Sequence, residues 1–319
     1  MSQPEAHSLT SDRLRRQSWY GAKRFVKAFL GLRLPHAAMR AAVALRPGLN
    51  ARGRLPAPRY MHEVQGRAGE ASFKMLRPGA CIIAKELYWG HGVRPVASDQ
   101  YALIAFVALG RDVDVVIDVG AYTGLFTLAS ATAHPAIQCH AFELVPDVFR
   151  LLFDNCVHND ILDRATLHPV AIGNAATCVI PVGSAGSALP DFYSTRLNFN
   201  QGVRVRVAPL DEMLSQLLDG KRLLVKIDVE GSEAEVLASG RKLLARYTPD
   251  ILCEVLPGPT PAVDVESILG SSYNFYLVRG DDLLESDRIR SPKGFRDWLF
   301  SAKSASELDE LGISVQRSR

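Results

Sequence analysis

From about residue 80 onward, short runs of apolar residues alternate with longer segments in which apolar residues recur at helical spacing. The apolar runs predict strands at 113–118, 137–143, 165–171, 177–182, 203–208, 222–228, 250–255, 273–278 and 298–300. The amphipathic segments predict helices at 122–133, 146–158, 210–218, 231–245 and 262–269. Strands that alternate with helices indicate an α/β fold, with a mainly parallel sheet and helices on both of its faces.

The N-terminal part of the chain has a different pattern. Within residues 14–34, apolar residues such as Trp19 and Phe29 fall on one helical face and basic residues lie largely on the other, which predicts an amphipathic helix. We expect Pro35 to end this helix, and residues 46–59, rich in Pro, Gly and Arg, to form a linker. We therefore expect a basic N-terminal extension, a main domain and a polar tail, at residues 1–80, 81–302 and 303–319.

Charge separates the extension from the main domain. The chain of 319 residues has a formal net charge of +3, but residues 1–60 alone carry 12 Lys and Arg against 2 Asp and Glu, so the remainder is negative by 7. A basic amphipathic helix fits a peripheral contact with a membrane surface or with a partner protein, through residues 14–34. Packing of its apolar face on the main domain is the interpretation that we favour. The main domain has no basic patch interleaved with aromatic residues, which argues against a nucleic-acid partner.

Cysteine usage and hydropathy bear on the compartment. The five cysteines are scattered, several of them in apolar runs, and this predicts reduced and mostly buried thiols. No uncharged apolar run is long enough for a transmembrane helix, and the first residues do not resemble a secretory signal. We therefore expect a cytoplasmic protein, with the extension as the candidate for peripheral membrane contact.

The most informative stretch is VDVVIDVGAYTG, residues 113–124. Its apolar run leads into Asp118, and Gly120 and Gly124 follow before the next helical segment. A buried strand that enters a glycine turn and a helix lets the backbone approach a nucleotide-like ligand closely. A second apolar run ends at Glu143, where a Rossmann-like unit holds a ribose. The pattern predicts a cofactor that contains adenosine.

The spacing of the glycines distinguishes between such cofactors. A dinucleotide site has the pattern G-x-G-x-x-G, whereas this chain has D-x-G-x-x-x-G with Asp118 in place of the first glycine. A carboxylate beside the turn repels a diphosphate, but it suits the sulfonium and ammonium groups of S-adenosylmethionine. We therefore favour a methyltransferase, with a nicotinamide-dependent oxidoreductase as the alternative and a non-catalytic binding protein as a third interpretation.

A second polar segment, LLVKIDVEGSEAE, follows the same design of an apolar strand that ends in charged residues. Ligands of open parallel sheets bind at the carboxyl ends of the strands, so Lys226, Asp228 and Glu230 are candidate catalytic residues. We expect Asp228 to orient or deprotonate an acceptor hydroxyl, with Glu230 as the second choice and Lys226 as a residue that holds an acceptor oxygen or tunes the acids. These carboxylates also suit a hard divalent cation, an interpretation that we do not favour.

Six segments of this chain, taken together, resemble the FkbM-type methyltransferase family over residues 85–300. They are DVGAYTG, FELVPDVFRLLFDNCVHN, HPVAIGN, PLDEML, VKIDVEGSEAEVL and ILCEV, in the order found in that family. The resemblance implies a class I S-adenosylmethionine-dependent methyltransferase that acts on hydroxyl groups of sugars, glycans or natural products, although N-methylation on the same fold stays open. It also implies a Rossmann-like, doubly wound sheet of seven strands, mainly parallel, with an antiparallel last strand.

The resemblance also assigns roles to individual residues. It implies that Asp118, Gly120, Gly124 and Glu143 form the cofactor site. We expect Ala121 and Tyr122 of the same turn to belong to this site, although the family commonly has Asn–Ile where this chain has Tyr122 and Thr123. It implies an acidic pair, Asp228 and Glu230, and places Glu254 at the end of the next strand, on the acceptor side. The loop 183–202 falls where the family has an insertion beside the active site, and it supplies the candidate acceptor contacts Ser184, Ser187, Tyr193 and Arg196. For any one of these four, a solvated loop without a binding role is about equally consistent with the sequence.

Overall fold

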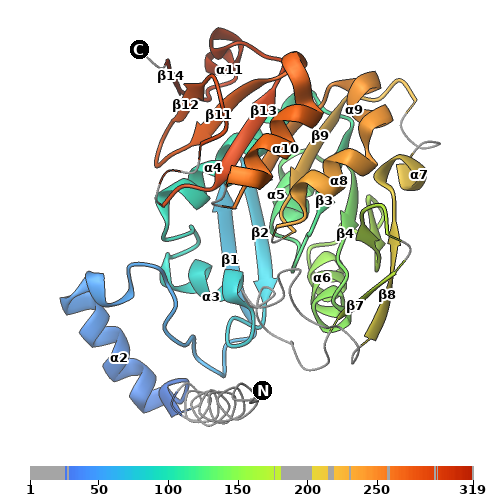
Figure 1. Ribbon diagram of the computed structural model, residues 1–319. Helices are drawn as coiled ribbons and strands as arrows, with labels where there is room; N and C mark the ends of the chain where they lie inside the picture. Colours follow the sequence, from blue (N-terminus) through green and yellow to red (C-terminus); the bar gives the residue numbers. More distant parts are fainter. Residues whose placement is uncertain are drawn as a thin grey trace, which may run out of the picture.

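The computed structural model describes residues 26, 29–175, 177–180, 203–214, 219–229, 231–256, 259–290, 292 and 294–317. Within this part of the chain, a central sheet lies between two layers of helices (Figure 1). The strands of the sheet, in spatial order, are β14 (Val315–Gln316), β12 (Leu283–Ser286), β11 (Asn274–Val278), β13 (Asp297–Ser301), β10 (Asp250–Glu254), β9 (Leu223–Ile227), β3 (Val115–Val119), β4 (Gln138–Phe142) and β5 (Ala165–His168).

The strand directions confirm a mainly parallel sheet. Strands β10, β9, β3, β4 and β5 run parallel to one another, whereas β13 is antiparallel to both of its neighbours, β10 and β11. The expected count of seven strands is corrected to nine among the described strands, because β12 returns on β11 as a hairpin and β14 pairs with β12. These two edge strands are four and two residues long, too short for a hydrophobic pattern to reveal them.

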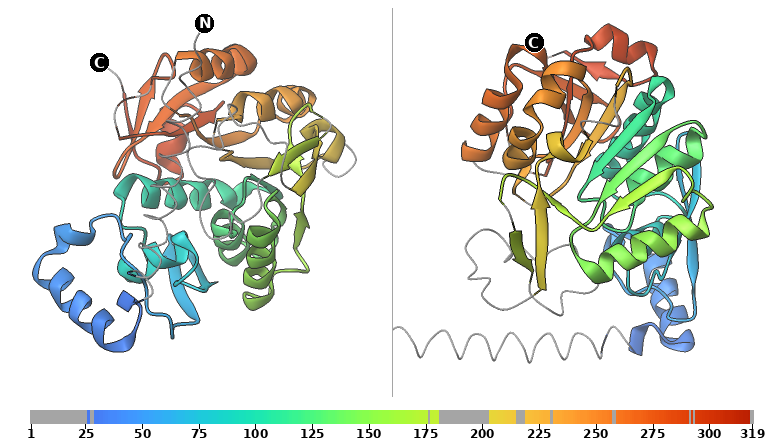
Figure 2. Two further views of the ribbon diagram at one scale, coloured as in Figure 1. Left: turned by 60° about the horizontal axis from the view of Figure 1, so that its bottom comes forward. Right: turned by 90° about the vertical axis from the view of Figure 1, so that its right-hand side faces the viewer.

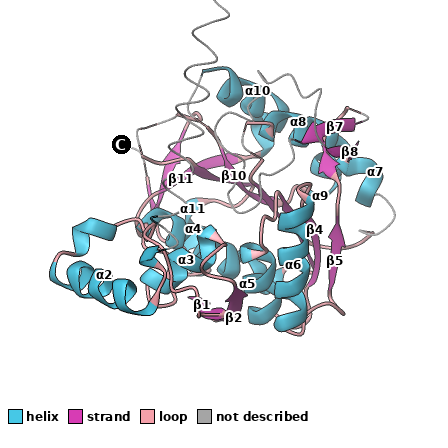
Figure 3. Ribbon diagram, turned by 90° about the horizontal axis from the view of Figure 1, so that it is seen from below, coloured by secondary structure: helices cyan, strands magenta, loops and turns pink. Residues whose placement is uncertain are grey.

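The two faces of the sheet are covered by different helices. One face carries α3 (Ile82–Trp89), α4 (Ala97–Leu109), α5 (Leu125–Ala133) and α6 (Pro146–His158). The other face carries α7 (Leu210–Leu214), α8 (Glu233–Ser239), α9 (Arg241–Tyr247) and α10 (Pro259–Leu269), and Figure 3 shows the sheet between the two layers. A further short helix, α11 (Ala305–Glu310), precedes β14. Because successive residues of a strand point to opposite faces, each strand supplies both layers: Val116 packs into one core and Ile117 into the other.

Two expected elements are divided in the structure. The helix expected at 231–245 is two helices, α8 and α9, which meet at Gly240. The strand expected at 165–171 ends at His168, and a separate strand β6 (Ala171–Ile172) begins after Pro169. Strand β6 pairs with β8 (Val203–Ala208), which also pairs with β7 (Thr177–Ile180), so these strands form a small separate sheet. Proline has no N–H to donate to a ladder, which accounts for the interruption.

A hairpin that the sequence did not predict belongs to the main packing unit. It consists of β1 (Glu63–Ala68) and β2 (Ala71–Leu76), and β2 packs against α5 and α6 (Figure 2). Ala71, Phe73 and Met75 alternate with exposed residues and are buried in the same core as α5. Residues on both sides of the boundary expected at residue 81 therefore belong to the same hydrophobic core.

The described part of the extension corrects the expected role of Pro35. Helix α2 (Arg33–Leu45) begins just before Pro35 and continues past it, and the 3-10 turn η1 (Pro47–Asn50) follows. Proline is tolerated in a first helical turn because its missing N–H has no intrahelical partner there. Residues 14–25 of the expected amphipathic helix lie outside the described residues. Among the described helices, none combines the length and the apolar composition that a membrane span requires.

Candidate active site

The glycine turn after β3 lies directly against the end of β9. Gly120 adopts a φ of +79°, and a Cβ atom built on it would lie 1.9 Å from the backbone oxygen of Asp228. Asp228 in turn donates its N–H to the backbone oxygen of Val119 at 2.9 Å. A side chain at residue 120 therefore has no room, and glycine is the residue that permits both the conformation and the contact. The two motifs found in the sequence thus form one site.

The N–H groups of this turn are largely used inside the protein. Gly120 and Ala121 donate to the backbone oxygen of Phe142 at 3.0 and 2.9 Å, and Gly124 donates to the oxygen of Ala121 at 2.8 Å. The N–H of Tyr122 donates to a carboxylate oxygen of Glu143 at 3.0 Å. A diphosphate needs free N–H donors at such a turn, and these four are engaged. The geometry therefore argues against a dinucleotide at this position.

Tyr122 occupies a conformation that favours glycine or asparagine. Its φ is +51°, in the left-handed region, which costs on the order of 1 kcal/mol for such a residue. Its ring is partly buried and packs against Val145 and Val148, at the start of α6, and burial raises the pKa of its hydroxyl. Packing against α6 thus offsets the backbone strain and fixes the shape of the turn.

Asp118 is buried and faces α5. One of its oxygens accepts from the N–H of Thr127 at 3.1 Å and from the Thr127 hydroxyl at 2.7 Å. Thr127 is in the first turn of α5, where N–H groups lack intrahelical partners, so Asp118 caps this helix from the neighbouring strand. Burial raises the pKa of Asp118 to about 6, against the hydrogen bonds from Thr127 and the charge of Lys226. The structure therefore gives Asp118 a positioning role, and a direct contact with a cofactor stays a prediction.

Glu143 is also buried but keeps unused acceptor positions. One oxygen accepts from Tyr122 and the other from the N–H of Val145, at 3.0 and 2.7 Å. Burial raises the pKa of Glu143 to about 7, although the N–H groups of Val145, Tyr122 and Leu144 oppose this shift by hydrogen bonding to the carboxylate. A carboxylate offers about four acceptor positions, so Glu143 retains acceptor capacity after these bonds. A carboxylate with such capacity at the end of β4 suits the hydroxyls of a ribose.

Lys226 lies at the centre of the second group of charges. Its side chain is buried, and its ammonium nitrogen lies 3.8 Å from an oxygen of Asp228 and 3.6 Å from an oxygen of Asp297. The same nitrogen lies 5.2 Å from the centre of the Phe126 ring. Burial by itself lowers the pKa of Lys226, but the surrounding carboxylates outweigh it, and the pKa is raised above its usual value. Lys226 is therefore a permanent cation that holds two carboxylates.

The carboxylates around Lys226 differ in exposure. The Asp228 side chain is 41% exposed and the Asp297 side chain 21%, while Glu254 is buried. Glu254 faces Asp297 in the β10–β13 register, and its Oε1 pairs with Arg296 at 3.0 Å. Its Oε2 is buried and has no hydrogen-bond partner in the part of the chain that the structure describes. Burial together with the charge of Asp228 raises the pKa of Glu254 despite Arg296. Asp228 is thus the carboxylate of this group that an incoming molecule reaches most readily.

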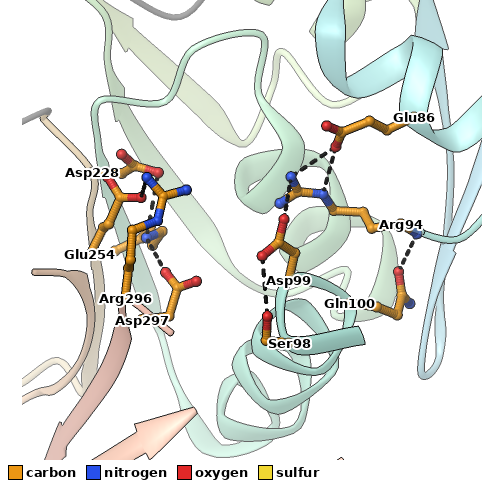
Figure 4. Close-up of polar contacts among 10 residues, drawn as sticks. Glu86, Arg94, Ser98, Asp99, Gln100, Asp228, Glu254, Arg296 and Asp297 are labelled. Atoms are coloured by element: carbon orange, nitrogen blue, oxygen red, sulfur yellow. Dashed lines mark hydrogen bonds and ion pairs between the residues drawn. The ribbon is translucent and has the colours of Figure 1, made fainter. Parts of the chain in front are cut away.

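A third group of charges comes from a part of the chain that the sequence interpretation did not assign. Arg94, in the segment between α3 and α4, binds Glu86 at 2.8 Å and Asp99 at 2.9 Å. Its backbone N–H donates to the side chain of Gln100 at 2.7 Å. Figure 4 shows this group facing the group of Asp228, Glu254, Arg296 and Asp297. Burial by itself lowers the pKa of Arg94, but the negative charges of Asp99, Glu86 and Asp297 outweigh it and raise the pKa above its usual value. In the sequence, Arg94 is a single basic residue between two helical segments, and nothing else there marks it as part of a site.

The structure brings together most of the predicted site residues. The expected cofactor residues Asp118, Gly120, Ala121, Tyr122, Gly124 and Glu143 lie at the ends of β3 and β4, and Lys226, Asp228 and Glu254 lie beside them at the ends of β9 and β10. Glu230, Ser184, Ser187, Tyr193 and Arg196 lie outside the described residues. Within the described ranges, no group of three or more His, Cys, Asp or Glu side chains is arranged to hold a metal ion.

Comparisons with known proteins agree on the kind of domain. The family model of the methyltransferase FkbM domain matches residues 118–278. The 31-O-demethyl-FK506 methyltransferase FkbM of Streptomyces tacrolimicus is 31% identical, in an alignment that covers 46% of this chain and 66% of that protein. The chain thus spans just under two thirds of the length of this relative.

Solved structures of methyltransferases are among the similar chains. Precorrin-6y C5,15-methyltransferase from Geobacter metallireducens is 14% identical with a TM-score of 0.39, over 65% of this chain and 88% of that one. An O-methyltransferase from Bacillus cereus in complex with SAH is 11% identical with a TM-score of 0.37, over 66% of this chain and 81% of that one.

Proposed function

The chain belongs to the FkbM methyltransferase domain family, and from this membership we propose that it is an S-adenosylmethionine-dependent O-methyltransferase. Its acceptor is a hydroxyl group of a small sugar, glycan or natural product. The observation that carries this proposal is the contact between the glycine turn and Asp228, because it places a candidate cofactor site beside an exposed carboxylate. The buried free thiols of Cys81, Cys139, Cys156 and Cys253 support a cytoplasmic location.

The residues around the turn fit the adenosyl group. Glu143 offers two adjacent oxygens to the ribose hydroxyls, and Gly120 lets the turn approach the end of β9 at Asp228. Asp118 and Tyr122 hold the turn in shape through α5 and α6. When bound, S-adenosylmethionine supplies a methyl group on a positively charged sulfur, which an oxygen nucleophile attacks in line. The carboxylates of the site favour a ligand that carries positive charge.

Asp228 is the residue that we assign to the acceptor hydroxyl. A hydroxyl is a weak nucleophile, and a carboxylate that accepts its proton increases its reactivity. Lys226 and the contact with Gly120 hold Asp228 in one place, which limits the loss of rate from poor alignment. Lys226 is buried and has two carboxylate neighbours, so its role is to position Asp228 and Asp297 rather than to transfer a proton.

The surroundings of Asp228 suit a polar acceptor. Arg296 is half exposed beside Glu254, and Asp297 and Asp99 are partly exposed. These side chains offer both charged donors and charged acceptors, which match the many hydroxyl groups of a sugar better than a flat apolar ring. A polyhydroxylated acceptor is therefore the class to test first.

The test separates cofactor binding from methyl transfer. The protein is incubated with isotopically labelled S-adenosylmethionine and a panel of glycosides and polyols, and products are followed by mass spectrometry. We expect Asp228→Asn to lower turnover by about 10²-fold or more while SAH affinity, measured by calorimetry, stays within about twofold of the parent. Asp287→Asn, at a carboxylate that is 75% exposed in a surface pair, serves as the matched control. Unchanged turnover in Asp228→Asn, or a parent protein that binds no SAH, contradicts the proposal.

A further inference from the structure

The segment from residue 26 to residue 60 carries an unusual share of exposed apolar side chains. Of the twelve large apolar side chains that are exposed among the described residues, seven lie there. Leu34 and Leu45 are each 84% exposed. The others are Val26, Phe29, Leu32, Leu49 and Tyr60. We call these seven side chains the apolar patch.

Two side chains of the patch, Leu34 and Leu45, lie on helix α2, which has two apolar faces. His36, Met39 and Val43 lie on its inner face, where they are buried or partly buried. Leu34, Ala38, Ala41 and Leu45 recur at helical spacing on the opposite face and are exposed. The outer face is therefore apolar and uncovered by the described part of the chain, and Figure 3 shows α2 standing clear of the two helical layers.

The inner face of α2 is anchored to the main body. The Nε2 of His36 is 2.8 Å from the Tyr88 hydroxyl, and the His36 ring lies 5.6 Å from the ring of Trp89, both in α3. The backbone N–H of Arg59 donates to the oxygen of Gly31, which ties the two ends of the segment together. Leu34 and Leu45 are thus displayed by a helix that is held in place.

Charge selects the partner of this patch. From residue 13 to residue 62 the chain contains no Asp or Glu. Six arginines lie between residues 33 and 59, and within the described residues none of them has a carboxylate oxygen within 4 Å: they are Arg33, Arg40, Arg46, Arg52, Arg54 and Arg59. On α2, Arg33 and Arg40 are two turns apart and lie on one side of the helix, between its two apolar faces. The segment therefore combines exposed apolar side chains with arginines that have no carboxylate partner among the described residues.

We propose that the described residues between 26 and 60 dock on an anionic lipid surface, with the apolar patch entering the boundary between headgroups and acyl chains. Amphipathic elements bind such surfaces through buried apolar area together with the attraction of arginine and lysine to anionic lipids. The rest of the chain, residues 61–319, carries a net charge of −7 and is repelled by the same surface. The charge asymmetry therefore orients the protein, with the extension on the membrane and the main body away from it. This inference does not depend on the methyl-transfer reaction.

Vesicle co-sedimentation of the full chain tests the proposal. We expect binding to phosphatidylcholine vesicles that contain about 30 mol% phosphatidylglycerol, little binding to phosphatidylcholine alone, and a loss of binding as salt rises from about 0.1 to 0.5 M. The double variant Leu34→Ser/Leu45→Ser should lower the partition coefficient by about tenfold or more, since less apolar area is buried. Arg33→Gln/Arg40→Gln should lower it for anionic vesicles and weaken the salt dependence.

Matched controls keep the outcome interpretable. Leu162→Ser/Val263→Ser removes two exposed apolar side chains on the main body and should leave vesicle binding unchanged. Thermal unfolding and SAH binding of all variants check that the fold is retained, and retention is expected because both leucines of α2 are mostly exposed. Equal binding of the leucine double variant and the parent, or equal binding to neutral and anionic vesicles, overturns the proposal. It is also overturned if sedimentation velocity shows a dimer that the leucine double variant converts to a monomer, because the patch is then a contact between two copies of the chain.

Discussion

The contact between Gly120 and Asp228 makes Gly120→Ala the most direct test of the site. The alanine Cβ would lie 1.9 Å from the backbone oxygen of Asp228, whereas real Cβ atoms essentially never approach within 3.0 Å, so one backbone must move by at least 1.1 Å. Both segments continue buried strands, β3 and β9, which pair directly and leave little freedom to separate. The displacement therefore falls on the turn and on Asp228 itself.

The expected magnitude has two parts. The φ of +79° penalises any residue with a Cβ by about 1–2 kcal/mol. Overpacking of a site that cannot relax adds about 1–3 kcal/mol. We therefore expect Gly120→Ala to lower the free energy of unfolding by about 2–5 kcal/mol. A shift of roughly 1 Å in Asp228 should also lower turnover by about 10²-fold.

Gly220→Ala is the matched control. Gly220 has a φ of +69°, but no atom of the described residues lies within 4 Å of the Cβ position, so this variant reports the backbone penalty. Urea denaturation of the parent and both variants measures the difference, and calorimetry with SAH measures the integrity of the turn. If Gly120→Ala is no more destabilising than Gly220→Ala and binds SAH as the parent does, the turn and the end of β9 are not in contact. The assignment of Gly120 and Asp228 to one site is then refuted.

Two further predictions follow from the buried charges. Burial raises the pKa of Glu143 to about 7, so the ionised form, which accepts hydrogen bonds from the ribose, increases between pH 6 and 8. SAH affinity should therefore rise about tenfold over that range, and Glu143→Gln should abolish the rise in calorimetric titrations. A pH-independent affinity in the parent would exclude Glu143 as the ribose ligand. Lys226→Met leaves Asp228 and Asp297 without their cation, and it should lower the free energy of unfolding by about 3–5 kcal/mol in urea and lower turnover more than SAH affinity. Parent-like turnover in this variant would show that Lys226 does not position Asp228.

Much of the fold could be predicted because it depends on local burial. Strands β3, β4, β9 and β10 are buried on both faces, so they appear in the sequence as continuous apolar runs. The hairpin strand β2 was missed although its sequence, ASFKML, alternates between buried and exposed residues. It lies next to a segment rich in Pro, Gly and Arg, and only its packing on α5 shows that it belongs to the core.

The candidate site was predicted where the residues follow a strand directly. Glu143 and Asp228 come at the ends of parallel strands, and parallel strands bring their carboxyl ends to one edge. Arg296 and Asp297 were not assigned because they lie at the start of β13. Since β13 is antiparallel to β10, its beginning meets the ends of the other strands at the same edge. The direction of that strand decides that Asp297 faces Lys226 and Glu254.

The sequence by itself determined the strands and helices from β3 to β11 in outline, the glycine turn and the residues that end the central strands, because hydrophobic periodicity and glycine spacing are local properties of the chain. Only the tertiary structure decided that Asp118 caps α5, that Arg94 and Asp99 stand opposite Asp297, and that α2 keeps an apolar face uncovered. These outcomes depend on which distant segments become neighbours. That choice is made by the packing of whole faces against one another, and no short stretch of sequence contains it.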